Sequence, residues 1–440
     1  MTEQQTEPQG RMPTCTMDDV IHAVDGIQRE QKIKDLLSCM TLEEKVRQMS
    51  GNAGLLDFLI MIVRYNHRPY PSGENKRHKI PPILFTDGPH GVAVGNSTCF
   101  PVSMARGATW DKELEQRIAN AMGIETRAQG ANFFGGVCIN LPRHPGWGRA
   151  QESFGEDPYL LAEMGTAMIQ GLQKHVMACA KHFAANSIEE ARFFVDVKID
   201  PRTLREVYLP HFRKCVDVKV AAFMSAYNKV NGKFCGHSKE LLTDILKKEW
   251  GFDGFVVSDF MLGIRSAKAV LAGLDIEMPF TWRYGRRLLK QVRKGRIPES
   301  VIDEAVTRII RKKAEFAEVG DPDGYDKSRV ACKEHKDLAL EAARKGIVLL
   351  KNEGPLLPLS EENVSKLAVI GKLADKANIG DKGSSQVYPP YTITPLQGIR
   401  DKAGQSVQVV YDHGKNLDRA RQAAADADVA VVVVDRKSVV

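Results

Sequence analysis

Strand-like and helix-like segments alternate between residues 80 and 320, and this alternation restricts the fold more than any other feature of the chain. Short apolar runs at 81–86, 176–180, 221–224 and 255–257 are separated by longer stretches with helical spacing of apolar residues, such as 160–173. Alternation of this kind predicts parallel strands joined by helical crossovers. The expected fold class is therefore α/β.

Polar residues recur where the predicted strands end. They are Asp87, Lys181 with His182, Tyr227 and Asp259. In a barrel the carboxyl ends of all strands converge on one face, whereas in an open sheet ligands gather at the switch point. A barrel explains why so many strands contribute, so we expect residues 31–320 to form a (β/α)8 TIM-like barrel.

Asp259 ends the segment GFDGFVVSDF, in which a glycine-bracketed turn leads into three β-forming residues. A carboxylate at the end of a buried parallel strand lies where α/β barrels keep their chemistry. Two interpretations are open from these residues alone. Asp259 is a catalytic nucleophile, or it caps the helix that follows, which is a common role of aspartate.

The other strand-end residues also have more than one interpretation. Asp87 and Asp259 together could serve as an acid/base or nucleophile pair. Neighbouring side chains on a strand point to opposite faces, so Lys181 and His182 reach one ligand only if the chain turns there. Both could bind sugar hydroxyls or form a structural ion pair. Lys181 could also be a Schiff-base lysine.

The length of 440 residues is too great for one ordinary core and predicts two domains. We expect an N-terminal tail at 1–30, the barrel at 31–320 and a linker at 321–336. A second unit at 337–440 repeats strand and helix patterns and stops on the apolar run 429–434. A domain that stops there leaves its sheet unfinished, so an incomplete α/β sandwich domain is expected.

Composition excludes several classes of function. The net charge of +7 comes from 62 basic and 55 acidic residues without a basic block, which argues against nucleic acid. The eight cysteines show no CxxC spacing, no secretory signal is visible, and no apolar run approaches membrane-spanning length. We therefore expect a cytoplasmic protein that does not bind membranes.

Motifs for metals and cofactors are missing from the sequence. The histidines lack HxH or HExxH spacing, and there is neither a P-loop nor a GxGxxG motif, so no metal and no cofactor is expected. Residues 64–80 are predicted to be a long loop. A second long loop at 141–160 contains Trp147 and Phe154, which are either stacking platforms for a sugar or packing residues.

Several ordered segments resemble one known family. They are NLPRHPGWGRAQESFGEDPYL, KHFAANSIEEARFFVDVKIDPRTLREVYLPHF, SAYNKVNG and GFDGFVVSDF, followed downstream by AARKGIVLLKNEGPLLPL and GSSQVYPPYTITPLQGI. Together they resemble glycoside hydrolase family 3, the β-glucosidase family, from about residue 40 to 434. Four multi-residue motifs in the right order are far more specific than any one of them.

The resemblance implies a function and a set of site residues. It implies a retaining, exo-acting β-glycosidase, with β-glucosidase expected first, β-xylosidase as the rival, and a small β-glucoside or oligosaccharide as substrate. Asp259 matches the nucleophile. The positions that match sugar-binding residues or line the site are Asp87, Arg149, Lys181, His182, Arg192 and Tyr227. Nearby cations are expected to keep Asp259 ionised.

The chain also departs from the family pattern. Phe260 follows the nucleophile where the family commonly has Trp, which keeps an aromatic wall but loses the indole N–H donor. KHFAANS stands in place of the histidine-bearing loop of the N-acetylglucosaminidase branch, which argues against that branch. The family's acid/base glutamate would lie beyond the apolar strand, so the resemblance implies a C-terminally truncated chain. An inactive sugar-binding fragment is therefore an alternative, and homo-oligomerisation is left open.

Overall fold

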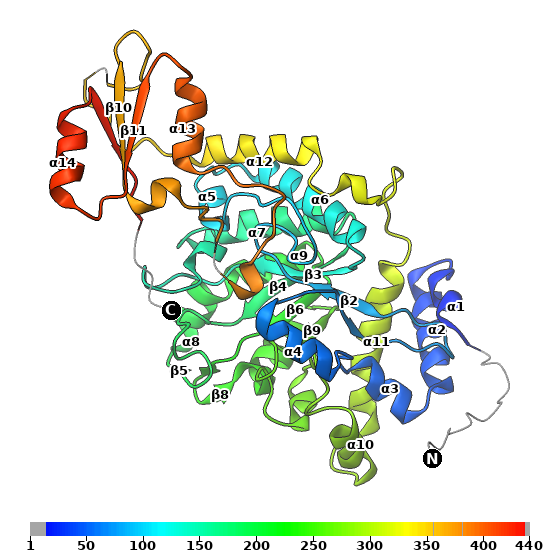
Figure 1. The fold of residues 1–440 in the computed structure, drawn as a ribbon. Coiled ribbons are helices and arrows are strands. Elements are labelled where there is room, and N and C mark those ends of the chain that lie inside the picture. Colours follow the sequence, from blue (N-terminus) through cyan, green and yellow to red (C-terminus); the bar gives the residue numbers. More distant parts are fainter. Residues whose placement is uncertain (1–14, 355, 381, 436–440) are drawn as a thin grey trace, which may run out of the picture.

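The computed structural model describes residues 15–354, 356–380 and 382–435. Figure 1 shows a large α/β unit and a smaller one, with the helix α12 (Lys333–Gly346) lying between them. The two units have separate apolar cores.

The large unit is built on a six-stranded sheet with the order β1-β2-β3-β4-β6-β9. Its strands are β1 (Tyr70–Ser72), β2 (Ile83–Thr86), β3 (Phe133–Cys138), β4 (Met177–Phe183), β6 (Ala222–Ser225) and β9 (Phe255–Val257). All neighbours from β2 to β9 pair in parallel. Strands β3, β4, β6 and β9 are buried along their whole length, which suits a parallel sheet covered on both faces.

The sheet does not contain the eight parallel strands that the alternation predicted. It has six strands in the described residues, and β1 runs antiparallel to β2. The reason is the short connection at 73–82, because a parallel return needs a crossover of about a dozen residues or more. Single bridges continue from Val257 to Ile276, from Glu277 to Ser50 and from Gly51 to Ser72, so the sheet curls from β9 back toward β1. The α/β class is confirmed.

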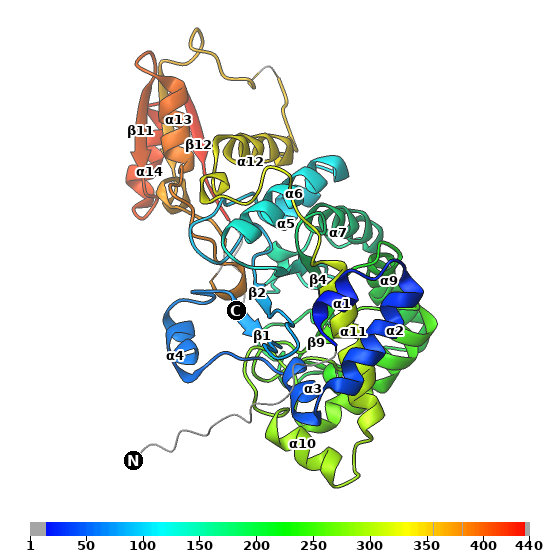
Figure 2. The same ribbon diagram turned by 90° about the vertical axis from the view of Figure 1, so that its right-hand side faces the viewer.

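Helices cover the outside of this curled sheet (Figures 1 and 2). They are α5 (Ser103–Gly107), α6 (Lys112–Ala128), α7 (Pro158–Leu172), α9 (Pro210–Asp217), η4 (Glu240–Glu249), η5 (Ala267–Ala272), α10 (Arg286–Arg293) and α11 (Glu299–Glu315). Their starts follow local chemistry: Asp111 and Asp157 cap α6 and α7 by accepting backbone N–H groups. Pro201 occupies the first position of α8 (Pro201–Thr203), where the missing N–H of proline costs no hydrogen bond.

The N-terminal helices begin earlier than expected. They are α1 (Met17–Ile21), α2 (Gly26–Cys39), α3 (Leu42–Gln48) and α4 (Leu55–Val63). Met17 and Val20 are fully buried in the large core, so this part of the predicted tail is ordered structure, while residues 1–14 lie outside the described residues. A capping box of Thr41 and Glu44 begins α3. The predicted loop at 64–80 contains β1.

Short elements complete the large unit and lead into the second. They are β5 (Asp196–Val197), β7 (Lys229–Val230), β8 (Lys233–Phe234), η1 (Ala150–Glu152), η2 (Leu204–Tyr208), η3 (Cys235–His237) and η6 (Lys327–Arg329). Strands β5, β7 and β8 form a small separate sheet. No helix among the described residues has both the length and the apolar character needed to span a bilayer.

The second unit is a three-stranded parallel sheet in the order β11-β10-β12. Its elements are β10 (Lys366–Ile370), β11 (Gln408–Asp412), β12 (Val429–Val432), α13 (Pro395–Ala403), α14 (Leu417–Ala425), η7 (Lys372–Asp375) and η8 (Gly383–Ser385). Strand β12 lies within the apolar run 429–434 of the sequence. The exact domain boundaries stay a prediction, and the residues after Asp435 lie outside the described residues.

Candidate active site

The carboxyl ends of the curled sheet open into a cavity of about 660 Å³. Eight of the residues that the sequence singled out line this cavity: Asp87, Arg149, Lys181, His182, Arg192, Tyr227, Asp259 and Phe260. Asp87 follows β2, Tyr227 follows β6 and Asp259 follows β9, so strand ends far apart in the sequence meet here. Their roles remain predictions, but the structure brings the whole set together.

Lys181 and His182 both reach the cavity although they are neighbours on β4. The pairing of β4 with β6 shifts between Ala180 and Phe183, so two residues of β4, Lys181 and His182, stand opposite the single residue Met224 of β6. Such a bulge re-aims side chains that would otherwise alternate between the two faces. The turn that both residues would need to reach one ligand is therefore supplied by an irregularity inside the strand.

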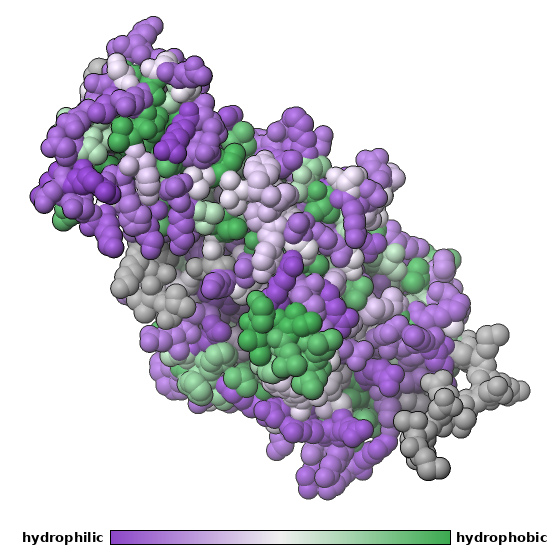
Figure 3. Space-filling view, viewed as in Figure 1, coloured by the Kyte–Doolittle hydropathy of each residue, from purple (hydrophilic) through white to green (hydrophobic). Residues whose placement is uncertain are grey.

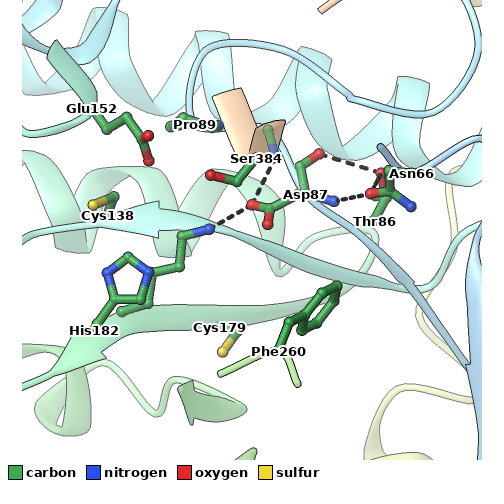
Figure 4. A network of polar contacts seen from close by, with 12 residues as sticks. Asn66, Thr86, Asp87, Pro89, Cys138, Glu152, Cys179, His182, Phe260 and Ser384 are labelled. Atoms are coloured by element: carbon green, nitrogen blue, oxygen red, sulfur yellow. Dashed lines mark hydrogen bonds and ion pairs between the residues drawn. The ribbon is translucent and has the colours of Figure 1, made fainter. Parts of the chain in front are cut away.

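Asp87 is held at one end of the cavity by three polar partners. Its Oδ1 accepts a 2.5 Å hydrogen bond from Lys181 Nζ, its Oδ2 accepts one of 3.0 Å from Tyr65, and its backbone N–H donates to Asn66 Oδ1 at 2.7 Å. Figure 4 shows Asn66 and Thr86 on one side of Asp87 and Ser384 on the other. Asp87 and Lys181 thus form a buried pair with a fixed orientation.

The amine of Lys181 is unsuited to Schiff-base chemistry in this setting. Burial is the largest single influence and lowers the pKa of Lys181, but the neighbouring acidic groups, first among them the Asp87 carboxylate and then Glu152, together raise it by more, so the net shift is upward. A Schiff base forms from the neutral amine, which needs a lowered pKa. The lyase interpretation of Lys181 therefore has no support in the geometry.

Arg149 connects the sugar-sized cavity to the second unit. Its guanidinium donates two hydrogen bonds to Glu152, of 2.9 and 2.7 Å, and a third of 3.1 Å to Ser384 Oγ from the second unit. Its Nη1 lies 3.0 Å from His182 Nε2. A bidentate pair of this kind fixes both the position and the plane of the guanidinium.

His182 is a neutral ring with one defined tautomer. Arg149 can only donate, so Nε2 accepts, and Nδ1 carries the proton that is donated to Asn140 Oδ1 at 2.8 Å. Burial, with Arg149 and Lys181 adding to it, lowers the pKa of His182 well below its ordinary value. The 3.6 Å contact between His182 Nε2 and Asp259 Oδ2 is therefore not an ion pair.

Asp259 does not cap a helix. Its Oδ1 accepts a 2.7 Å hydrogen bond from the N–H of Phe260, and the next helical turn, η5, begins at Ala267 with Ser266 in the capping position. Among the described residues, Asp259 Oδ2 is buried and accepts no hydrogen bond. One carboxylate oxygen is thus fixed by the backbone and the other remains available to a ligand.

Burial raises the pKa of the Asp259 carboxyl above its ordinary value, although Arg149, the Phe260 N–H and Lys181 each pull it down. The expectation that nearby cations keep Asp259 ionised therefore leaves out the effect of burial. Removal from water outweighs them, because a buried carboxylate loses hydration that fixed charges replace only in part.

Aromatic groups form the wall beside Asp259. The Tyr227 hydroxyl donates to the backbone oxygen of Phe260 at 2.8 Å, and the Arg192 guanidinium lies 5.5 Å from the centre of the Tyr227 ring. The Phe260 ring packs on Phe85 with 4.9 Å between ring centres. Phe260 and Tyr227 thus form an aromatic wall beside Asp259, and Phe260 packs against the core residue Phe85.

Sequence reasoning missed several lining residues. They are Met61, Tyr65, Gly148, Glu152, Glu189, Met224, Met261, Lys382, Gly383 and Ser384. Lys382, Gly383 and Ser384 come from the second unit. The same segment contacts the large unit at two more points: the backbone oxygen of Ile379 lies 2.9 Å from His90 Nε2, and the backbone oxygen of Tyr388 accepts a hydrogen bond from the N–H of Ser97. The GSSQ segment belongs to one of the motifs that resemble the family, but nothing local to it indicates a contact with Arg149, 235 positions earlier.

Two aromatic residues proposed as stacking platforms lie elsewhere. Trp147 and Phe154 are buried and are not among the residues lining the cavity, and the Phe154 ring packs under the Arg106 guanidinium. They are packing residues of the long loop. Within the described part of the chain, no three His, Cys, Asp or Glu side chains are placed to hold a metal ion.

Charge pairing singles out one carboxylate of the four that line the cavity. Asp87 pairs with Lys181, Glu152 with Arg149 and Glu189 with Arg192, and each pair is in direct contact. Within the residues that the structure describes, Asp259 has no lysine or arginine in such contact. Paired carboxylates orient donors for hydroxyl groups, whereas an unpaired, buried carboxylate is suited to attack an electrophilic carbon.

Comparison with known families matches this geometry. The sequence model described as "Glycosyl hydrolase family 3 N terminal domain" matches residues 66–312, and the one described as "Glycosyl hydrolase family 3 C-terminal domain" matches residues 347–440. The first covers more than half of the chain and includes every predicted site residue.

Curated relatives and solved structures agree with the family models. The chain is 36% identical over 433 residues to thermostable beta-glucosidase B of Acetivibrio thermocellus, with 91% of this chain and 54% of the relative aligned. The crystal structure of a beta-D-glucoside glucohydrolase from Trichoderma reesei is similar with a TM-score of 0.80 and 30% identity, over 92% of this chain and 59% of that one. The beta-glucosidase DesR from Streptomyces venezuelae, solved with D-glucose, gives 0.79 and 30%, over 88% and 50%. The chain spans about half the length of the curated relatives it matches.

Proposed function

The chain belongs to glycoside hydrolase family 3, and from that premise we propose that it carries the sugar-binding cavity and the nucleophile of a retaining β-glucosidase. The observation that carries the proposal is Asp259 Oδ2, which is buried in the cavity without a hydrogen-bond partner or cation of its own among the described residues. The relatives named above as beta-glucosidases support glucose as the sugar. We further propose that the curled sheet acts as a closed barrel, with the single bridges at 50–51 and 276–277 completing the circuit.

In the proposed mechanism Asp259 Oδ2 attacks the anomeric carbon. The C1–O bond to the aglycone breaks as the ester bond to Asp259 forms, and water later cleaves that ester. The paired groups Asp87, Lys181 and Arg149 orient the sugar hydroxyls, because each presents a charged atom whose position a partner fixes.

The leaving group needs a proton from a second carboxyl group in a retaining glycosidase. Glu152 is a buried carboxyl of the cavity, and its contacts with Arg149 overcome the effect of burial and lower its pKa. Such a group stays ionised and cannot act as the acid. We therefore propose that the proton donor lies outside the described residues, and a sugar-binding function without turnover is the second candidate.

An activated fluoro-sugar separates these two functions, because its leaving group departs without a proton. We expect the 440-residue chain to accumulate one covalent fluoroglucosyl group, located by mass spectrometry on the peptide that contains Asp259. A chain that binds glucose in calorimetry but takes up no label would be a sugar-binding protein without a nucleophile. A chain that neither binds nor becomes labelled would contradict both candidates.

The rate of labelling should depend on pH in a defined direction. Only ionised Asp259 can attack, and its raised pKa places the half-maximal rate above pH 3.8, with the rate rising toward higher pH. The double substitution R149M/E152Q removes a cation that lowers this pKa, together with that cation's buried partner. The midpoint should then move upward by about one pH unit. R143M removes an exposed arginine of the same long loop and should leave the midpoint unchanged. A downward shift in the double variant would contradict the proposed electrostatics.

A further inference from the structure

Helix α4 presents an exposed apolar surface at the mouth of the cavity. Its sequence is LLDFLIMIV, and five of its side chains are more than half exposed: Leu55 at 77%, Leu56 at 69%, Leu59 at 54%, Ile62 at 71% and Val63 at 89%. Figure 3 shows a continuous green area over the place that α4 occupies in Figure 1. A contiguous exposed apolar surface usually marks a binding site.

The helix is firmly attached by its other side. Asp57 accepts hydrogen bonds of 2.7 and 2.6 Å from Arg68, and Phe58 makes edge contacts with Phe280 and Trp282 at 5.8 and 6.3 Å between ring centres. The N-terminal N–H of Gly54 donates to Asp57 as well. The exposed side chains are therefore held on a fixed element rather than on a loose loop.

The exposed surface is continuous with the wall of the cavity. Met61 of α4 and Tyr65 just after it line the cavity, and Tyr65 donates to Asp87 at its charged end. Met261, two residues after Asp259, lines the same cavity. The lining thus changes from charged groups around Asp87 and Asp259 to methionines and then to the aliphatic side chains of α4.

A ligand that matches this arrangement has a sugar at one end and an apolar group at the other. We propose that the exposed face of α4 binds the aglycone, and that the chain takes β-glucosides whose aglycone is apolar. The inference rests on the proposed function, because it needs the sugar to lie in the cavity. It goes further in naming the class of aglycone and the residues that select it.

Binding of two thioglucosides, which the enzyme cannot cleave, tests the inference by calorimetry. We expect the 440-residue chain to bind n-octyl 1-thio-β-D-glucoside, below its micelle-forming concentration, about tenfold more tightly than methyl 1-thio-β-D-glucoside. Tenfold corresponds to about 1.4 kcal/mol, and partial burial of the alkyl chain readily supplies it. The double variant L59Q/I62Q should lose this preference and keep the affinity for the methyl compound.

Matched controls distinguish the possible failures. I347Q/L350Q changes two equally apolar residues that are 79% and 92% exposed and do not line the cavity, and it should keep the tenfold preference. Loss of the preference in both double variants would show unspecific binding of the alkyl chain and overturn the inference. Equal affinities of the wild-type chain for the two thioglucosides would overturn it as well, while leaving the proposed function intact. If neither thioglucoside bound, both the proposed function and the inference would be overturned.

Discussion

Asp259→Asn is expected to abolish covalent labelling by an activated fluoro-sugar, with a loss of at least about 10³-fold in the labelling rate. The amide has nearly the shape of the carboxylate but cannot form the ester bond to the anomeric carbon. Glucose should still bind, because the groups that hold Asp87 and Arg149 in place do not involve Asp259 Oδ2. Mass spectrometry of the labelled chain and calorimetry with glucose measure the two effects separately.

The control for this variant is an exposed aspartate that lies outside the cavity. Asp217 is exposed at the end of α9 and does not line the cavity, so Asp217→Asn should label at the rate of the unmodified chain. Undiminished labelling of the Asp259→Asn chain would place the nucleophile elsewhere. Loss of glucose binding together with labelling would instead mean that Asp259 holds the cavity in shape.

Arg106→Met should lower the free energy of unfolding by about 3–5 kcal/mol. Arg106 on α5 and Glu115 on α6 are 1% and 0% exposed, and their 2.6 Å ion pair lies inside the large core. Removing the arginine leaves Glu115 buried without a counter-charge, and it also removes the hydrogen bond to the backbone oxygen of Pro89, next to Asp87. Denaturation by urea, followed by circular dichroism, measures the change.

The pH dependence of this loss has a predictable sign. Burial raises the pKa of Glu115 to about 6 even with Arg106 in contact. Without Arg106 the carboxyl group would be forced toward its neutral form, so Arg106→Met should cost less at pH 5 than at pH 8. Arg117→Met is the matched control, because Arg117 forms an exposed pair with Glu341 and surface pairs contribute about 1 kcal/mol or less. Equal losses in the two variants would contradict the assignment of Arg106 as a buried structural cation.

The α/β class and the cavity residues at strand ends could be predicted because both follow from local patterns, whereas Arg149 and Arg192 were indicated only by the family resemblance. Short apolar runs ending in Asp87, Tyr227 and Asp259 indicate parallel strands with polar ends, and those ends meet because parallel strands point the same way. The role of each residue as nucleophile or sugar ligand still awaits the experiments above. What could be foreseen was the gathering of the residues, not their chemistry.

Other features depend on contacts between distant segments and left no local signal. The antiparallel β1 lies in a stretch rich in Pro, Gly and charged residues, and it is a strand only because β2 pairs with it. The bulge at Lys181 and His182 depends on the register between β4 and β6. Glu152 and Glu189 stand out only through Arg149 and Arg192, with which they form ion pairs in the folded chain.

The segment from Ile379 to Tyr388 has a thermodynamic consequence. It docks on the large unit through His90, Ser97 and Arg149 and supplies Lys382, Gly383 and Ser384 to the cavity wall. A sugar bound in the cavity as proposed would contact both units at once. Its binding free energy would then be coupled to the free energy with which the segment docks on the large unit. Thermodynamic coupling is reciprocal, so if docking of the segment strengthens sugar binding, sugar binding stabilises the docked segment by the same free energy. On the proposed function, the contacts between the two units would therefore contribute to sugar affinity together with the side chains at the bottom of the cavity.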